Sequence, residues 1–110
     1  MAKFAVLLYV PAPANPLELT PEELEGHEKF GAKLGELGGT IVDGHALLSS
    51  TEAVTIRDGV AVDGPWGDGK EVVTGFMVLE ARDRDHAIEI AKHAPGAGVE
   101  VRPLFEPPAE

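Results

Sequence analysis

Cysteine is absent from this sequence of 110 residues, which excludes disulfides, thiol catalysis and thiolate metal sites. Basic residues are few, because 9 Lys and Arg stand against 19 Asp and Glu, for a formal net charge of −10. Such a surface repels phosphate groups, so we expect neither nucleic acid nor a membrane as a partner. No apolar run approaches the roughly 20 residues of a membrane span, and the start lacks the layout of a signal peptide. We therefore expect a soluble, cytoplasmic protein.

The length predicts a single domain over residues 1–110,. Hydrophobic residues make up 44% and charged residues 25% of the chain, a composition typical of folded globular proteins. No linker divides the sequence. At this length we expect no second, regulatory domain,.

The turn and capping signals predict the order β-α-β, a small hairpin, and then β-α-β. The clearest signal is Thr20-Pro21-Glu22-Glu23, which places a Thr N-cap before a helical Pro and a Glu three residues after the cap,. The expected strands are 3–10, 40–48 with a kink at Gly44, 71–81 and 99–104, and a hairpin is expected from 51–57 and 60–62 around Asp58-Gly59,. The expected helices are 21–37 and about ten residues after Asp83, ended by Pro95-Gly96,. A Pro-rich tail covers 106–110. This order predicts an α+β, ferredoxin-like sandwich with both helices on one face of an antiparallel sheet.

Two of the expected strands, 3–10 and 71–81, are apolar on both faces,. The ferredoxin-like order places these two strands in the centre of the sheet. Two helices cover only one face of a sheet, so the other face needs a different cover. The simplest cover is a second copy of the chain, and we expect a homodimer with the sheets face to face.

His27 is the first candidate for chemistry. At about 100° per residue it falls on the apolar arc of the first helix, with Leu24, Phe30, Leu34 and Leu37,. One interpretation is an acid–base imidazole in a partly apolar cleft. The other is a packed histidine whose ring nitrogens bond a backbone carbonyl or water.

His45 follows Asp43 by two positions in an expected strand, so the two side chains project from the same face,. They are either an oriented imidazole, a pair of metal ligands, or ordinary neighbours. His86 and His93 fall at the edge of the second helix's apolar arc and are read as boundary residues. No HxH or HxxxH spacing occurs, and we expect no metal site,.

The segment Asp63-Gly64-Pro65-Trp66 combines a turn with the only tryptophan. Its structural interpretation is a turn anchored by a buried Trp. Its functional interpretation is a carboxylate, Asp63, at the mouth of a pocket with Trp66 in its wall. Dinucleotide-binding, phosphate-binding and serine hydrolase motifs are absent,.

The chain resembles the YCII-related family, in its DGPF-domain branch, over nearly its full length. The residues that carry this resemblance, in the family's order, are Lys3-Phe4-Ala5-Val6-Leu7-Leu8-Tyr9, His27 with Phe30, Arg57-Asp58-Gly59, Asp63-Gly64-Pro65-Trp66, Lys70-Glu71, Gly75-Phe76 and Val99-Glu100-Val101-Arg102-Pro103. Trp66 stands where the name motif of the branch has Phe.

The resemblance implies a ferredoxin-like fold that pairs into a dimeric α+β barrel, with a site built around a histidine and an aspartate. His27 matches the histidine. In the YciI-like branch an aspartate precedes the Pro after the second helix, but here His93-Ala94-Pro95 stands there, and Asp63 is the alternative carboxylate. Family members include a dehydrochlorinase, and others are encoded beside sigma factors or fused to them.

Two functions follow as expectations. The first is a cofactor-independent lyase or isomerase for a small cyclic or aromatic molecule, with His27 and Asp63 as the catalytic residues and Tyr9, His45 and Trp66 lining the pocket. The second is a non-catalytic dimer that binds a small molecule or a regulatory protein.

Overall fold

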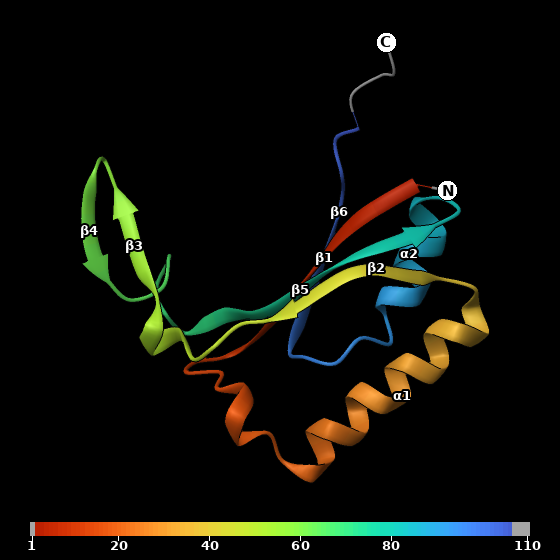
Figure 1. Ribbon diagram of the computed structural model, residues 1–110, viewed down its shortest axis with the longest axis horizontal. Helices are drawn as coiled ribbons and strands as arrows, with labels where there is room; N and C mark the ends of the chain where they lie inside the picture. Colours follow the sequence, from red (N-terminus) through yellow and green to blue (C-terminus); the bar gives the residue numbers. More distant parts are fainter. Residues whose placement is uncertain (1, 107–110) are drawn as a thin grey trace.

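Four strands form one antiparallel sheet in the order β2-β5-β1-β6 (Figure 1). The computed structural model describes residues 2–106. The strands of the sheet are β1 (Ala2–Pro11), β2 (Thr40–Ala46), β5 (Glu71–Ala81) and β6 (Gly98–Pro103). The order and the directions are compatible with the expected ferredoxin-like α+β fold, and the two strands expected in the centre are central.

The other elements are two helices, two short 3₁₀ turns and a separate hairpin: α1 (Pro21–Leu37), α2 (Arg84–Ala91), η1 (Pro16–Glu18), η2 (Ser50–Glu52), β3 (Val54–Arg57) and β4 (Val60–Asp63). Neither described helix is long and apolar enough to span a bilayer.

Both ends of α1 lie where the sequence predicts them. The Thr20 hydroxyl accepts a hydrogen bond from the Glu23 N–H at 3.1 Å, and the Glu23 carboxylate accepts one from the Thr20 N–H at 3.4 Å. This reciprocal capping box satisfies N–H groups that have no partner inside the helix. At the other end Gly38 takes a left-handed conformation with φ 76°, which a residue without a Cβ adopts at little cost.

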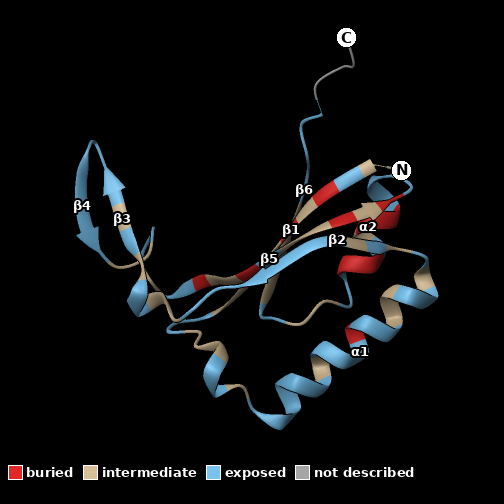
Figure 2. Cartoon of the chain, in the orientation of Figure 1, coloured by how far each residue is buried: buried red, intermediate tan, exposed pale blue. Residues whose placement is uncertain are grey.

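The core lies between one face of the sheet and α2. Phe4, Val6 and Leu8 of β1 are buried on this face, and Phe4 pairs with the fully buried Leu79 of β5. Ile90 of α2 is also fully buried against this face. Figure 2 shows the buried positions concentrated in β1, β5 and α2, with a single one in α1.

The opposite face of the sheet has no helix and is still apolar in its centre. Ala5 pairs with Val78 and Leu7 with Phe76 across β1 and β5, so these four side chains share that face. Phe76 is 38% exposed. The helix-free face therefore carries the apolar side chains from which the sequence predicts a second layer.

Helix α1 packs less closely on the sheet than the apolar arc predicts. Phe30 is its only buried residue among those described, and Leu34 and Leu37 are partly buried against the core. Leu24, on the same arc, is 51% exposed. The N-terminal half of α1 thus stands away from the strands, and the space between them is hollow.

Four local expectations need correction. The strand expected over 51–57 begins only at Val54, because residues 50–52 form a 3₁₀ turn that the Ser49 hydroxyl caps by accepting a hydrogen bond from the Thr51 N–H at 3.3 Å,. Helix α2 ends at Ala91, before the expected stop at Pro95. The irregularity in β2 falls between Ile41 and Asp43 and not at Gly44. The last strand is Gly98–Pro103, and the expected tail beyond Glu106 lies outside the described residues.

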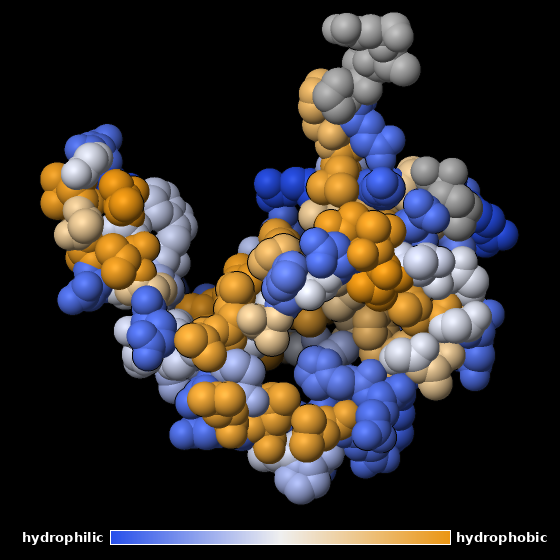
Figure 3. Space-filling view, in the orientation of Figure 1, coloured by the Kyte–Doolittle hydropathy of each residue, from blue (hydrophilic) through white to orange (hydrophobic). Residues whose placement is uncertain are grey.

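The β3–β4 hairpin forms an arm that projects from the sheet (Figure 1). Its turn is Asp58-Gly59, as predicted, with φ values of 52° and 79° that fit a two-residue hairpin turn,. Apolar side chains lie on the arm beside polar ones, as the orange atoms in Figure 3 show, and the exposed apolar residues are Val54, Ile56, Val60 and Val62.

Candidate functional site

His27 lies in the middle of α1, where the helix stands away from the sheet. Its side chain is exposed, and it lines two adjoining cavities on the helix-covered side of the sheet. Leu8, Leu19 and Thr74 also line both cavities. We call these two cavities together the α1 cleft.

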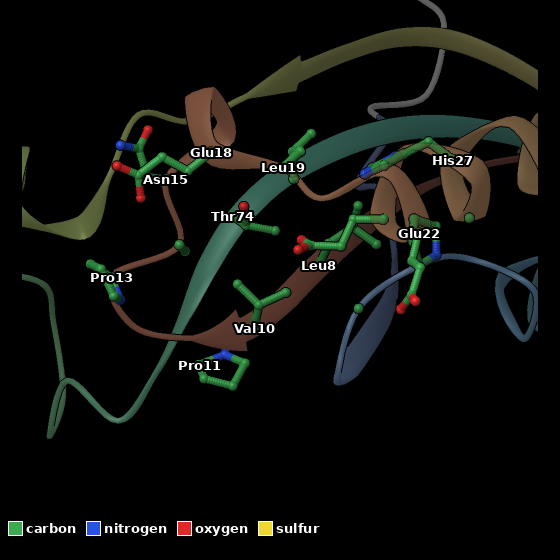
Figure 4. Close-up of a pocket in the computed structure, with 15 residues that line it drawn as sticks. Leu8, Val10, Pro11, Pro13, Asn15, Glu18, Leu19, Glu22, His27 and Thr74 are labelled. Carbon is green, nitrogen blue, oxygen red and sulfur yellow. The ribbon is translucent and has the colours of Figure 1, made fainter.

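The first part of the α1 cleft has a volume of about 620 Å³ and lies between η1, the start of α1 and the ends of β1 and β5. In Figure 4 the imidazole of His27 extends from α1 toward Leu19, above the strands that carry Leu8 and Thr74. Glu18 and Glu22 supply carboxylates to this part. The volume falls in the range of small-molecule sites, roughly 300–1,000 Å³.

The second part, of about 410 Å³, is almost entirely apolar. It lies between α1 and the strands β2 and β5, and its apolar side chains are Leu24, Phe30, Leu34, Ile41 and Met77. An apolar wall of this kind binds the flat face of a ring or a short aliphatic chain.

The polar groups of the cleft divide into those that cap helices and those that are free. Asn15 accepts a hydrogen bond from the Leu17 N–H at 3.0 Å, and Glu23 is held in the capping box. Among residues 2–106, the imidazole of His27 and the hydroxyl of Thr74 have no hydrogen-bond partner in the protein. The exposure of His27 argues against the packed-histidine interpretation.

Asp63, the expected partner of His27, lies on β4 of the arm and is exposed. It does not line the α1 cleft, and Figure 1 shows the arm well apart from α1. A single chain therefore does not bring His27 and Asp63 together. The carboxylates that share the cleft with His27 are Glu18, Glu22 and Glu23.

His45 and Asp43 project from the same face of β2, as predicted. The imidazole Nε2 lies 3.1 Å from the Asp43 carboxylate Oδ1, and the ring packs against Phe76 with 5.5 Å between centroids. Both side chains are more than half exposed. His45 also borders the second part of the α1 cleft. Over the described part of the chain, no three His, Asp or Glu side chains come together as a metal site.

Tyr9 and Trp66 line one cavity, but it is not the cavity that His27 lines, whereas the sequence interpretation placed all three in a single pocket. Their cavity of about 480 Å³ lies at the base of the arm and has no lining residue in common with the α1 cleft. Trp66 is 65% exposed, so it does not anchor its loop by burial.

The sequence interpretation missed Thr74 and the glutamates of the cleft. Thr74 sits opposite the register shift between Leu8 and Tyr9, where β5 carries one extra residue,. A hydroxyl within the apolar stretch 72–79 of this strand was the available signal. Glu22 was read only as a helix-start residue, although the N-terminal turn of α1 also forms the rim of the cleft.

The described geometry combines an apolar chamber, a free imidazole and a free hydroxyl. An imidazole accepts and releases protons near neutral pH. The cleft is thus able to hold a small apolar molecule with one polar group beside His27.

The sequence model of the YCII-related domain matches residues 5–106, which include both helices, His27 and the described strands apart from the first three residues of β1. A search among curated proteins found no match. The match covers far more than half of the chain, and the chain belongs to the YCII-related domain family.

Proposed function

We propose that the α1 cleft binds a small cyclic or aromatic molecule and that His27 moves a proton on it in a lyase or isomerase reaction that uses no cofactor. The observation that carries the proposal is the exposed imidazole of His27, without a protein partner among the described residues, at the junction of a polar and an apolar chamber. Within the family we assign the chain to the DGPF branch, on the strength of Asp63-Gly64-Pro65-Trp66.

The proton transfer starts with His27 as general base. A ring nitrogen accepts the proton of a substrate C–H next to a carbonyl, and the electron pair of that bond moves onto the carbonyl oxygen. In an isomerase the proton returns to a different carbon; in a lyase the electron pair expels a leaving anion from the neighbouring carbon. Positioned proton transfer of this kind accelerates reactions by about 10²–10⁴.

Thr74 is the group placed to stabilise the intermediate oxygen. It lines both parts of the cleft from β5, opposite α1, and its hydroxyl has no protein partner among residues 2–106. Donation of a hydrogen bond to the developing negative charge lowers the energy of that state. Asp63 takes part only if another copy of the chain brings it to the cleft.

Proton abstraction is detectable before the natural substrate is known. Cyclic ketones and lactones incubated with the protein in D₂O should exchange the C–H that His27 abstracts, and ¹H NMR follows the loss of that signal. His27→Gln should abolish the protein-dependent exchange and retain binding, whereas His93→Gln, at an exposed position outside the cleft, should leave it unchanged.

Full exchange by the His27→Gln variant would refute the acid–base role. Binding of these compounds by the wild type without any exchange would instead support a non-catalytic ligand-binding protein, the second function that the sequence suggested. The two outcomes are separated by measuring binding in parallel through the shift of the thermal unfolding midpoint.

We further propose that the partner of the chain is a second copy, placed over the helix-free face of the sheet to form a dimeric α+β barrel. The chain has an accessible surface of 7551 Å² at 11.6 kDa, whereas a compact monomer of this mass exposes about 5,800 Å². Its radius of gyration of 15.3 Å also exceeds the value of about 13 Å expected for this length.

The surplus surface is large enough for a stable dimer interface, which buries on the order of 800 Å² per partner. Ala5, Leu7, Phe76 and Val78 supply an apolar centre for it. Two chains of −10 each repel one another, so apolar burial has to be the main attraction.

A further inference from the structure

The chain's only tyrosine and only tryptophan line the same cavity at the base of the arm. Tyr9 comes from the end of β1, and Trp66 comes from the loop between β4 and β5. Together with Leu47, Leu48 and Val73 they wall a cavity of about 480 Å³, which we call the arm-base cavity. Its size and its aromatic, apolar walls are those of a small-molecule site, and the proposed acid–base reaction does not use it.

Hydrogen bonds between distant segments hold the walls of this cavity in place. The Ser50 N–H donates to the carbonyl of Pro13 at 2.8 Å, and the Ser49 hydroxyl donates to the same carbonyl at 3.1 Å. The Gly64 N–H donates to the carbonyl of Ala53 at 2.8 Å. A cavity formed in advance binds with a smaller loss of conformational entropy than one that must be assembled.

The charged residues that line the cavity all carry the same sign. Glu52 and Glu71 are exposed carboxylates, and no Lys, Arg or His lines the cavity. Neither glutamate has an ion-pair partner among the described residues. Together with the overall charge of −10, this favours a cation and opposes an anion.

The indole of Trp66 already interacts with a cation. The guanidinium carbon of Arg57 lies 4.2 Å from the centroid of the ring, although Arg57 does not line the cavity. Trp gives the strongest cation–π attraction of the aromatic side chains. With 65% of the residue exposed, the indole retains a surface for a ligand.

We propose that the arm-base cavity binds a small organic ammonium, with its apolar body between Tyr9 and Trp66 and its positive group toward Glu52 and Glu71. The apolar walls account for the body of the ligand, and the carboxylates and the indole account for its charge. The site is separate from the α1 cleft and does not depend on His27.

Trp66 is the only tryptophan, so its fluorescence reports binding without a label. The probes are phenethylammonium, the neutral 2-phenylethanol and the anionic 3-phenylpropionate, which share an aromatic ring and differ in charge. The ammonium should change the fluorescence saturably, the alcohol should bind about three- to tenfold more weakly, and the carboxylate more weakly still.

Substitutions of residues that line the arm-base cavity test whether phenethylammonium binds there. The double variant Glu52→Gln/Glu71→Gln should lose about three- to tenfold in affinity for phenethylammonium and should no longer distinguish it from the alcohol. The matched control Glu28→Gln/Glu106→Gln removes the same charge at exposed positions outside the cavity and should keep the wild-type affinity. The Trp66→Leu variant should also bind phenethylammonium more weakly, as measured by calorimetry.

Equal binding of the three probes by the wild-type protein would overturn the proposal, because it would show apolar adsorption alone. An absence of saturable ammonium binding would overturn it as well, and neither result depends on how a variant folds. His27→Gln should leave ammonium binding unchanged. Failure of the ammonium site can therefore be distinguished from failure of the acid–base role of His27.

Discussion

The imidazole of His86 joins the start of α2 to the end of α1, because its Nε2 donates a hydrogen bond to the main-chain carbonyl of Leu37 at 2.6 Å. Its Nδ1 accepts from the Arg82 N–H at 3.0 Å, so both ring nitrogens are satisfied. The side chain is buried. His86 is therefore packed by the protein, whereas His27 has no such partners among the described residues.

Replacement of His86 by Ala should destabilise the fold by about 2–4 kcal/mol, since it removes two hydrogen bonds and leaves a cavity. The Leu37 carbonyl would then lose its link to α2. Urea unfolding followed by circular dichroism measures the change. His93→Ala, at an exposed position, should cost less than about 0.5 kcal/mol; a similar loss in both variants would contradict the bridging role.

Gly75 keeps β2 and β5 in contact at the wall of the α1 cleft. A Cβ there would lie 2.9 Å from the main-chain carbonyl oxygen of His45, and a backbone atom cannot move aside cheaply. Gly75→Ala should therefore cost on the order of 1–3 kcal/mol.

Gly35 provides the matched comparison, because a Cβ at this helical position meets nothing within 4 Å. Gly35→Ala should stabilise the protein by about 0.5–1 kcal/mol through its higher helix propensity. Thermal unfolding of the two variants should show midpoints shifted in opposite directions. A Gly75→Ala variant as stable as the wild type would mean that the two strands lie farther apart than described.

The proposed dimer depends on the helix-free face of the sheet. Leu7→Glu places a charge in the centre of that face, opposite Phe76, and should convert the dimer to a monomer in sedimentation velocity at micromolar concentration. Leu17→Glu makes the same change at an 81% exposed position in η1 and should leave the dimer intact. A wild-type protein that sediments as a monomer would contradict the proposal.

Local signals in the sequence predicted much of the fold. The capping box at Thr20 and the left-handed Gly38 determine the ends of α1 through contacts within a few residues, and the Asp58-Gly59 turn works in the same way. The apolar faces of 3–10 and 71–81 correctly placed these strands in the centre of the sheet.

Local sequence patterns of this kind do not predict long-range contacts. The partner of His86 is a carbonyl 49 residues away, and a main-chain carbonyl has no signature in the sequence. The exposure of Leu24 depends on how far α1 stands from the sheet, which the helical wheel does not describe. For the same reason the sequence grouped Tyr9, Trp66 and Asp63 with His27, whereas the fold divides them between a cavity, an arm and the α1 cleft.

The most direct test of the central claim is a titration of the protein's four histidines with phenol and with δ-valerolactone, followed in imidazole ¹H–¹³C NMR spectra. The His27 resonances, assigned by their loss in His27→Gln, should shift saturably, while those of the buried His86 and the exposed His93 should stay in place. Probe binding that leaves the His27 resonances unmoved, or that shifts His93 as much as His27, would contradict the assignment of His27 to a binding cleft.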